Sequence, residues 1–381
     1  MSKYVEIPVF ILGPGNVGGE LLRQILASRM QLLDRKNIHI KIIGMNSRSM
    51  HWYDPNGFSD SAIIQILDKY NASRCNGSNV PALPIKRLPS GCVVVDTTAS
   101  DEISPLLHSY LHAGCGVVLA NKKPLSNPWR EASIFFENPC VRREATVCAG
   151  LPIIYTLNYL QNTGDHVVSI EGNLSGTLGF LCAQLRKGIT YSQAVLAALK
   201  HGYTEPDPRD DLNGQDVARK ILILARTAGF QLELENIIVE SLIPNGLGRI
   251  PTDRFLEQIP EADNEFAEKS KYARSRGKCL QYVARVDENG GSASLKEIDA
   301  SSISGSLRGP ESYVAVTTER YKDNPLIITG PGSGPAITAA AVYQDILDLG
   351  VQMQQSAVGV EPMKAFAPNL LLHNRSNILL E

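Results

Sequence analysis

The densest group of reactive side chains lies between Gly202 and Lys220, where two prolines stiffen a stretch that carries five carboxylates. Gly214 then leads into a predicted helix, on which Asp216 and Lys220 are four residues apart and therefore share a face. A lysine ammonium beside a carbonyl oxygen stabilises the alkoxide that develops as hydride arrives, and it supplies a proton. The alternative is an exposed ion pair on a solvated helix, which contributes roughly a few tenths of a kcal/mol.

Apolar side chains cover most of the rest of this helix, so little of its surface is left for simple solvation. They are Val217, Ala218, Ile221, Leu222 and Leu224. We therefore expect the carboxylates here to be buried and to need cations, for which a lysine and the ammonium group of a substrate are natural partners.

A glycine-rich turn near the start of the chain, residues 13–18, has the form GxGxxG and lies between a predicted strand and a predicted helix. The first glycine permits a tight turn, the second lets the backbone approach a pyrophosphate, and the third allows close packing at the positive end of the helix. The alternative is a glycine-rich turn without a ligand. The candidate cofactor-binding residues are Gly13, Gly15, Asn16, Val17 and Gly18.

The segment after the second predicted strand carries no carboxylate, although NAD enzymes usually place one there for the ribose hydroxyls. Instead, Arg48 stands between Ser47 and Ser49, a set that can hold a 2′-phosphate. This favours NADP over NAD. A solvated loop arginine is the alternative.

Polar residues also follow two further predicted strands, at 96–100 and 120–124, on the same crevice edge as the glycine turn. Thr98 and Lys122 can face the nicotinamide side of a bound dinucleotide. By position alone, Lys122 is equally compatible with a merely solvated side chain.

These candidates need a scaffold, and the front of the chain predicts one. Strands at 7–12 and 38–44 alternate with a helix at 17–30, which indicates a Rossmann-type, doubly wound α/β sheet with parallel strands. We assign residues 1–150 to this dinucleotide-binding domain. A helix at about 335–350 is expected to return to it.

Residues 151–334 are predicted to form a second domain of the α+β class, with helices at 191–200 and 214–227. After residue 263 the chain is charged and rich in glycine and serine, with short strands that we expect to be antiparallel. Residues 351–381 are a tail that the pattern does not place. The expected late strands are 280–286, 312–317 and 325–329.

Composition excludes several classes of protein. The chain has 381 residues, 20% of them charged, and a formal charge of −2, so it has neither a basic surface for nucleic acid nor an acidic tail. It shows no export signal and no apolar run long enough for a membrane helix, which predicts a cytoplasmic protein. Seven scattered cysteines without metal spacing favour free thiols.

Five segments together resemble the homoserine dehydrogenase family over nearly the whole chain, from Pro8 to about Leu349, without an aspartokinase domain. The resemblance implies NAD(P)-dependent interconversion of aspartate 4-semialdehyde and homoserine, in threonine, methionine and isoleucine biosynthesis. It also implies a homodimer and makes residues 151–334 the domain for substrate binding and dimerisation. The segments are GYTEPDPRDDLNGQDVARK (202–220), EATVCAGLPII (144–154), SGTLGF (175–180), ANKKPLS (120–126) and GPGSG (330–334).

The resemblance also implies roles for matching residues. Lys122 and Lys220 resemble two catalytic lysines, with Lys220 as the proton donor, and Glu205 and Asp216 resemble carboxylates that hold the substrate's amino group. Cys148 replaces a glycine of the family in a loop that resembles a site for a monovalent cation such as Na⁺. The remaining positions are Gly176, Thr177, Tyr203 and Asp211 in the substrate pocket, Glu144, Val147, Ala149 and Leu151 at the cation, and Thr98 and Gly332 on the nicotinamide side.

Two alternatives remain open at this stage. One is another Rossmann reductase of amino-acid metabolism, acting on a cyclic imine or a different semialdehyde. The other is a catalytically silent dinucleotide-binding protein. The presence of both lysines together with the carboxylates argues against it, because a silent relative would be expected to have lost at least one of them.

Overall fold

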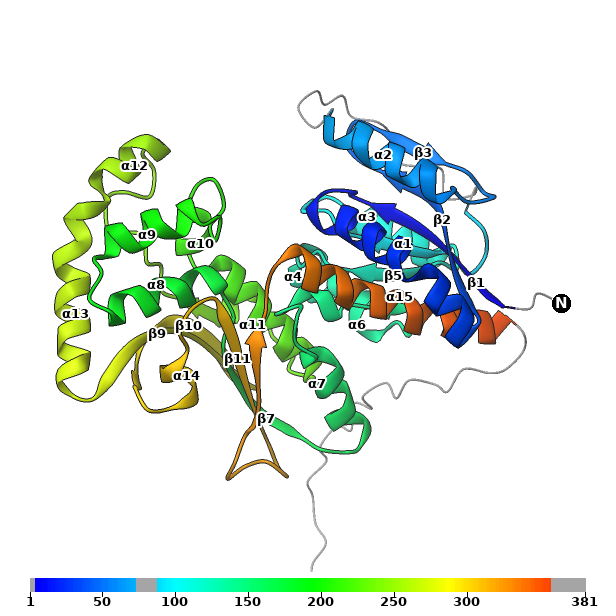
Figure 1. Cartoon of the computed structure of the whole chain (residues 1–381). Coiled ribbons are helices and arrows are strands. Elements are labelled where there is room, and N and C mark those ends of the chain that lie inside the picture. Colours follow the sequence, from blue (N-terminus) through cyan, green and yellow to red (C-terminus); the bar gives the residue numbers. More distant parts are fainter. Residues whose placement is uncertain (1–3, 73–87, 358–381) are drawn as a thin grey trace, which may run out of the picture.

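A computed structural model describes residues 4–72 and 88–357, which form two lobes, each built on a six-stranded sheet (Figure 1). The β-branched runs of the front of the chain form the first sheet, in the order β3-β2-β1-β4-β5-β6. All neighbours are parallel except β3, which pairs antiparallel with β2. This is the Rossmann strand order, so the predicted fold class is confirmed. The strands are β1 (Val5–Leu12), β2 (Ile38–Asn46), β3 (His51–Tyr53), β4 (Val93–Asp96), β5 (Gly116–Leu119) and β6 (Val141–Arg142).

Helices connect these strands and lead into the second lobe. They are α1 (Asn16–Lys36), α2 (Asp60–Ala72), α3 (Ser104–His112), α4 (Lys123–Ser126), α5 (Trp129–Ala132), α6 (Ile134–Glu137), the 3₁₀ turn η2 (Glu144–Thr146) and α7 (Ile153–Asn162).

The second sheet has the order β12-β11-β7-β9-β10-β8 and is antiparallel except for the pair β8 and β10. Its strands are β7 (Val167–Asn173), β8 (Ile237–Val239), β9 (Lys278–Asp287), β10 (Gly290–Asp299), β11 (Glu311–Thr318) and β12 (Leu326–Pro331). Its helices are α8 (Gly176–Arg186), α9 (Tyr191–Lys200), α10 (Arg209–Leu212), α11 (Gln215–Thr227), η3 (Leu234–Asn236), α12 (Thr252–Gln258), η4 (Ile259–Ala262), α13 (Asp263–Ser275) and α14 (Ile303–Ser306).

The sequence pattern assigned no helix or strand to two segments of the second lobe. The charged segment 263–275 is helix α13, because Phe266, Ser270 and Ala273 give it one buried stripe at helical spacing. The glycine- and serine-rich residues 290–294 form strand β10, because pairing along the whole of β9 overrides their low strand propensity.

The last helix, α15 (Pro335–Ala357), returns to the first lobe and lies beside α1 (Figure 1). Its buried residues Val342, Ile346 and Leu349 share a cluster with Ile7 and Ile11 of β1. The chain therefore crosses between the lobes twice, after β6 and before α15. The predicted tail is helical to residue 357, and its remainder, 358–381, lies outside the described residues.

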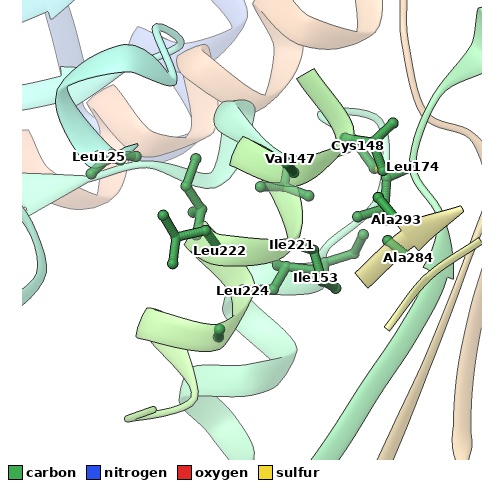
Figure 2. Close-up of a cluster of buried hydrophobic side chains, with 14 of the residues drawn as sticks. Leu125, Val147, Cys148, Ile153, Leu174, Ile221, Leu222, Leu224, Ala284 and Ala293 are labelled. Carbon is green, nitrogen blue, oxygen red and sulfur yellow. The ribbon is translucent and has the colours of Figure 1, made fainter. Parts of the chain in front are cut away.

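Helix α11 stands where the two lobes meet. It contacts α4 of the first lobe and β9 of the second sheet. Figure 2 draws the buried cluster around it, with Leu222 and Ile221 between Leu125 on one side and Ala284 and Ala293 on the other. No helix within the described ranges combines the length and apolarity that crossing a membrane demands.

Candidate active site

Asp216 lies between two lysines that come from different lobes. Its Oδ2 atom is 2.8 Å from Nζ of Lys220, one turn later on α11, and its Oδ1 atom is 3.1 Å from Nζ of Lys122, which follows β5. Lys220 also donates a hydrogen bond of 2.7 Å to the carbonyl of Leu174, just beyond β7. The structure thus brings the two predicted lysines to one carboxylate.

The charges in this group stabilise one another. Burial alone lowers the pKa of Lys220, but the adjacent carboxylate of Asp216 outweighs it, and the pKa lies above its ordinary value. Desolvation would raise the pKa of Asp216, yet the ammonium groups of Lys220 and Lys122 hold it well below its ordinary value. Asp216 and Lys220 are therefore both charged at neutral pH.

The prediction that Asp216 is buried was wrong: 37% of its side chain is exposed, whereas the Lys220 side chain is 14% exposed. The reason is its position in the first turn of α11. Gly214 starts this helix with φ of +73°, and a Cβ there would lie 2.2 Å from the Tyr282 hydroxyl. Only glycine fits this close approach, which sets where α11 begins.

The glycine turn is built for close backbone contact. Gly13 has φ of +87°, and a Cβ on Gly18 would lie 2.4 Å from the Gly13 carbonyl oxygen. Gly15 is the N-cap of α1 and no side chain caps the helix, so the N–H groups of its first turn, which contains Asn16 and Val17, suit an anion. A cavity of about 240 Å³ opens beside this turn, lined in part by Gly15, Asn16 and Pro335.

Residues that sequence reasoning did not assign fix the turn and Lys122 in place. The Thr97 hydroxyl donates to the Gly13 carbonyl at 2.6 Å. The side chain of Asn121 donates to Asp96 at 3.2 Å and to the Ser100 carbonyl at 2.9 Å. Burial raises the pKa of Asp96 to about 6. Their one signal in the sequence is that each ends a β-branched run.

Thr98 belongs to the same network. Its backbone N–H donates to Asp96 at 2.9 Å, and its methyl group lies 3.0 Å from where a Cβ on Gly13 would be. The predicted nicotinamide-side residue is therefore in contact with the glycine turn.

Arg48 is exposed in the turn between β2 and β3. The Ser47 hydroxyl accepts the N–H groups of Met50 at 3.0 Å and Ser49 at 3.3 Å, so this serine shapes the turn. The Gly13 N–H donates to the Asn46 carbonyl at 2.8 Å, which brings the glycine turn to the end of β2. Arg48 is thus near the glycine turn, two residues after Asn46.

The acidic loop before α11 is held by Asp211. One oxygen of Asp211 accepts the Thr177 hydroxyl at 2.9 Å, and the other accepts the Glu205 N–H at 2.9 Å. The same Thr177 hydroxyl also lies within hydrogen-bonding distance of the carbonyl of Tyr203, a residue that is 41% exposed. Asp211 therefore shapes the loop, while the Glu205 side chain is exposed and shows no hydrogen bond to the described residues.

Glycines bring the turn after β12 against both lobes. A Cβ on Gly176, at the start of α8, would lie 3.2 Å from Oγ of Ser333, and one on Gly332 would lie 2.1 Å from Oγ of Ser312. The buried Cys148 is next to Gly332 and has φ of +46°. It adopts the left-handed backbone that glycine favours.

The loop of residues 144–151 turns back on itself at the start of α7. The Glu144 carboxylate accepts the N–H groups of Ile154 at 3.1 Å and Tyr155 at 2.7 Å, and burial raises its pKa to about 7. The Leu151 carbonyl accepts the N–H of Ile153 at 2.9 Å. Within the described residues, no hydrogen bond reaches the carbonyls of Val147 and Ala149.

The strand order and the glycine turn define a dinucleotide-binding fold of the Rossmann type, with a lysine–carboxylate–lysine group between its lobes. The chain belongs to the homoserine dehydrogenase family, whose model matches residues 152–347. The family predicted from the sequence is thereby confirmed.

The chain is similar to a homoserine dehydrogenase of Schizosaccharomyces pombe, at 34% identity over 93% of this chain and 98% of that protein. It is 36% identical to a chloroplastic bifunctional aspartokinase/homoserine dehydrogenase 2 of Zea mays, over 92% of this chain and 39% of that protein. The chain thus spans well under half the length of this bifunctional relative.

Its fold matches that of a hyperthermophilic archaeal homoserine dehydrogenase solved in complex with NADPH. The TM-score is 0.68 at 21% identity, over 91% of this chain and 98% of that chain. At this level of identity, the likeness establishes the shared fold.

Proposed function

We propose that this chain is an NAD(P)-dependent homoserine dehydrogenase, which interconverts aspartate 4-semialdehyde and homoserine. The observation that carries the proposal is the pairing of Asp216 with both Lys122 and Lys220 at 3.1 and 2.8 Å, between the dinucleotide-binding lobe and the second lobe. A silent dinucleotide-binding protein has no need to hold two ammonium groups on one carboxylate. Such a group suits stabilisation and protonation of a reacting oxygen.

Each residue has a distinct part in the proposed reaction. A bound nicotinamide cofactor supplies the hydride. Lys220 gives its proton to the carbonyl oxygen, and Lys122 stabilises the negative charge that develops there. Asp216 orients both ammonium groups and keeps Lys220 protonated. The carboxylate of Glu205, in the exposed part of the loop, binds the amino group of the substrate.

Replacement of Lys220 by alanine tests the assignment. We expect kcat to fall by on the order of 10² or more, with cofactor affinity largely unchanged, because a general acid contributes that much to turnover. The matched control is Lys200→Ala, an exposed lysine at the end of α9 that leaves turnover unaffected. Normal turnover in the Lys220 variant would remove the proposed role.

Substrate choice separates this function from the reductase alternative. The enzyme oxidises homoserine faster than other small amino alcohols, because Glu205, Thr177 and Asp211 suit a short chain with an amino group. The rate of NADPH formation reports this directly. Faster oxidation of another amino alcohol would assign the site to a different reductase.

NADP is proposed as the preferred form of the cofactor. Arg48 stands exposed near the glycine turn, and no carboxylate follows β2 in residues 46–49. A guanidinium pairs strongly with a 2′-phosphate. Arg48→Ala should therefore raise KM for NADP about tenfold and leave KM for NAD unchanged, since one charge-assisted pair is lost. Equal effects on both cofactors would exclude this contact.

A monovalent cation such as Na⁺ is also proposed, held by the carbonyls of Val147 and Ala149 together with Glu144 and the Leu151 carbonyl. No hydrogen bond from the part of the chain that the structure describes reaches the first two carbonyls, and the other two ligands each keep a lone pair beyond the hydrogen bonds they accept. Oxygen ligands suit hard cations. Thermal unfolding in sodium chloride against choline chloride at equal ionic strength tests this, because only a bound cation raises Tm selectively.

A homodimer is proposed through the second sheet. Its edge strand β12 exposes every second residue, with Ile327 36% exposed, next to a small cluster of Leu307, Tyr313 and Ala315. An edge strand with apolar side chains invites a second copy. Sedimentation equilibrium decides the question, and Ile327→Lys should shift the dimer toward monomer.

A further inference from the structure

The guanidinium of Arg226, in the last turn of α11, is fully buried, with 0% of its side chain exposed. Nε donates to the carbonyl of Leu232 at 3.0 Å. Nη1 donates to the carbonyls of Leu125 and Asn127, both at 2.8 Å. Nη2 donates to the carboxylate of Glu233 at 2.6 Å. The buried charge is thus surrounded by four acceptors.

Two of these acceptors belong to the first lobe, in the segment directly after Lys122. Leu125 lies in α4, whose N-cap is Lys122, and the Leu125 N–H donates to the Lys122 carbonyl at 3.1 Å. Glu233 reaches the same segment, because its oxygens accept the N–H of Trp129 at 2.9 and 3.2 Å. The guanidinium of Arg226 also lies 5.5 Å from the centre of the Trp129 ring. We call Arg226, Glu233 and Trp129 the arginine clamp.

Lys122 is therefore held from both sides. On one side, Asn121 is bound to Asp96 and to the Ser100 carbonyl at the end of the first sheet. On the other side, the arginine clamp fixes the backbone of residues 125–129. The same helix that ends in the clamp carries Lys220 and Asp216, which lie about 9 Å and about 15 Å from Arg226 along the helix axis.

We propose that Arg226 is a positioning residue for the reaction, which holds the Lys122 segment of the first lobe in register with Asp216 and Lys220 of the second. This inference rests on the proposed function. Apolar packing between α11 and α4 could hold the lobes together, but it does not fix where the backbone of α4 lies. Directed hydrogen bonds from a rigid, planar group to the carbonyls of Leu125 and of Asn127, the C-cap of α4, do so.

Arg226→Lys tests the proposal, because lysine keeps the charge but its single nitrogen cannot reach all four acceptors. The matched control is Arg130→Lys, which lies in α5 and has 84% of its side chain exposed. Both variants are assayed with homoserine and with homoserine deuterated at the carbon that bears the hydroxyl. Rates are expressed per folded molecule.

We expect Arg226→Lys to lower kcat about tenfold or more, because small misplacements of reacting groups are costly even when they begin far from the chemistry. The isotope effect on kcat rises, since the chemical step becomes slower relative to product release, while KM for the cofactor stays within about twofold. Arg130→Lys matches the unmodified chain. A role in stability alone would lower Tm and leave kcat and the isotope effect unchanged, which would overturn the proposal.

If Arg226→Lys does not fold, Glu233→Gln decides. It preserves the shape of the clamp and the bonds from Arg226 to Leu125 and Asn127, but it weakens the hold on Trp129. A smaller fall in kcat with a raised isotope effect supports the proposal, and an unchanged kcat overturns it. Failure of the unmodified enzyme to oxidise homoserine would instead refute the proposed function.

Discussion

The pairing of Asp216 with two lysines makes a quantitative prediction for Asp216→Asn. At an effective dielectric constant of about 20, two unit charges about 3 Å apart attract by roughly 5 kcal/mol. The Asp216 side chain is 37% exposed, and solvent screening reduces this to about 1 to 3 kcal/mol. The asparagine variant should therefore lower the pKa of Lys220 by roughly one to two units. Repulsion from Lys122, no longer compensated, acts in the same direction.

The assay is the pH dependence of kcat/KM for reduction of the semialdehyde by NADPH. Reduction needs Lys220 in its protonated form, so activity is lost as pH rises through the pKa of Lys220. In the unmodified enzyme this pKa is raised, which places the alkaline limb at high pH. In Asp216→Asn the limb should move to lower pH by roughly one to two units.

Asp210→Asn is the matched control, because Asp210 is an exposed carboxylate in the neighbouring α10 and should leave the limb unchanged. A lower kcat/KM in Asp216→Asn with an alkaline limb at its original pH would refute the reasoning. Asp216 would then orient groups without tuning the Lys220 proton.

Three further changes have defined outcomes. Gly18→Ala puts a Cβ 2.4 Å from a carbonyl of the same turn, and it should raise KM for the cofactor at least about tenfold, as read from initial rates. Gly214→Ala should lower the free energy of unfolding in urea by about 2 to 3 kcal/mol and also lower kcat, because its Cβ meets Tyr282 and displaces the start of α11. The control is Gly246→Ala, where φ is +85° and a Cβ meets no atom, so that its effect measures the backbone strain alone. Asp207→Asn should lower the free energy of unfolding by about 1 to 2 kcal/mol at neutral pH, because hydrogen bonds from the adjacent arginine lower the pKa of Asp207 to about 2. In urea unfolding, the difference from the unmodified protein should vanish as pH falls from about 4 to about 2.

Local patterns accounted for the Rossmann sheet and for one half of the active site. The four-residue spacing of Asp216 and Lys220 is a property of any helix, so their contact at 2.8 Å could be predicted. The contact of Lys122 with the same carboxylate could not be derived from spacing, because it depends on how the lobes pack. Before the structure, only the resemblance to a family indicated that Lys122 and Lys220 belong to the same site.

Residues that act through others escaped prediction for the same reason. Nothing in the sequence distinguishes Arg226 from an exposed arginine at the end of a helix, where a positive charge is common. Its four acceptors come from segments that only the folded chain brings together. Asp96 at the end of β4 and Asn121 just after β5 likewise come together only because these two strands are neighbours in the sheet.

The return of α15 to the first lobe bears on how the protein is made. Ribosomes deliver the front of the chain first, and domains commonly fold in that order. Here Ile7 and Ile11 pack in one cluster with Val342, Ile346 and Leu349, which are synthesised more than three hundred residues later. The leading lobe therefore stays an incomplete nascent structure with uncovered apolar surface until the second lobe has emerged, and its completion is a late event that invites chaperone binding in the interval.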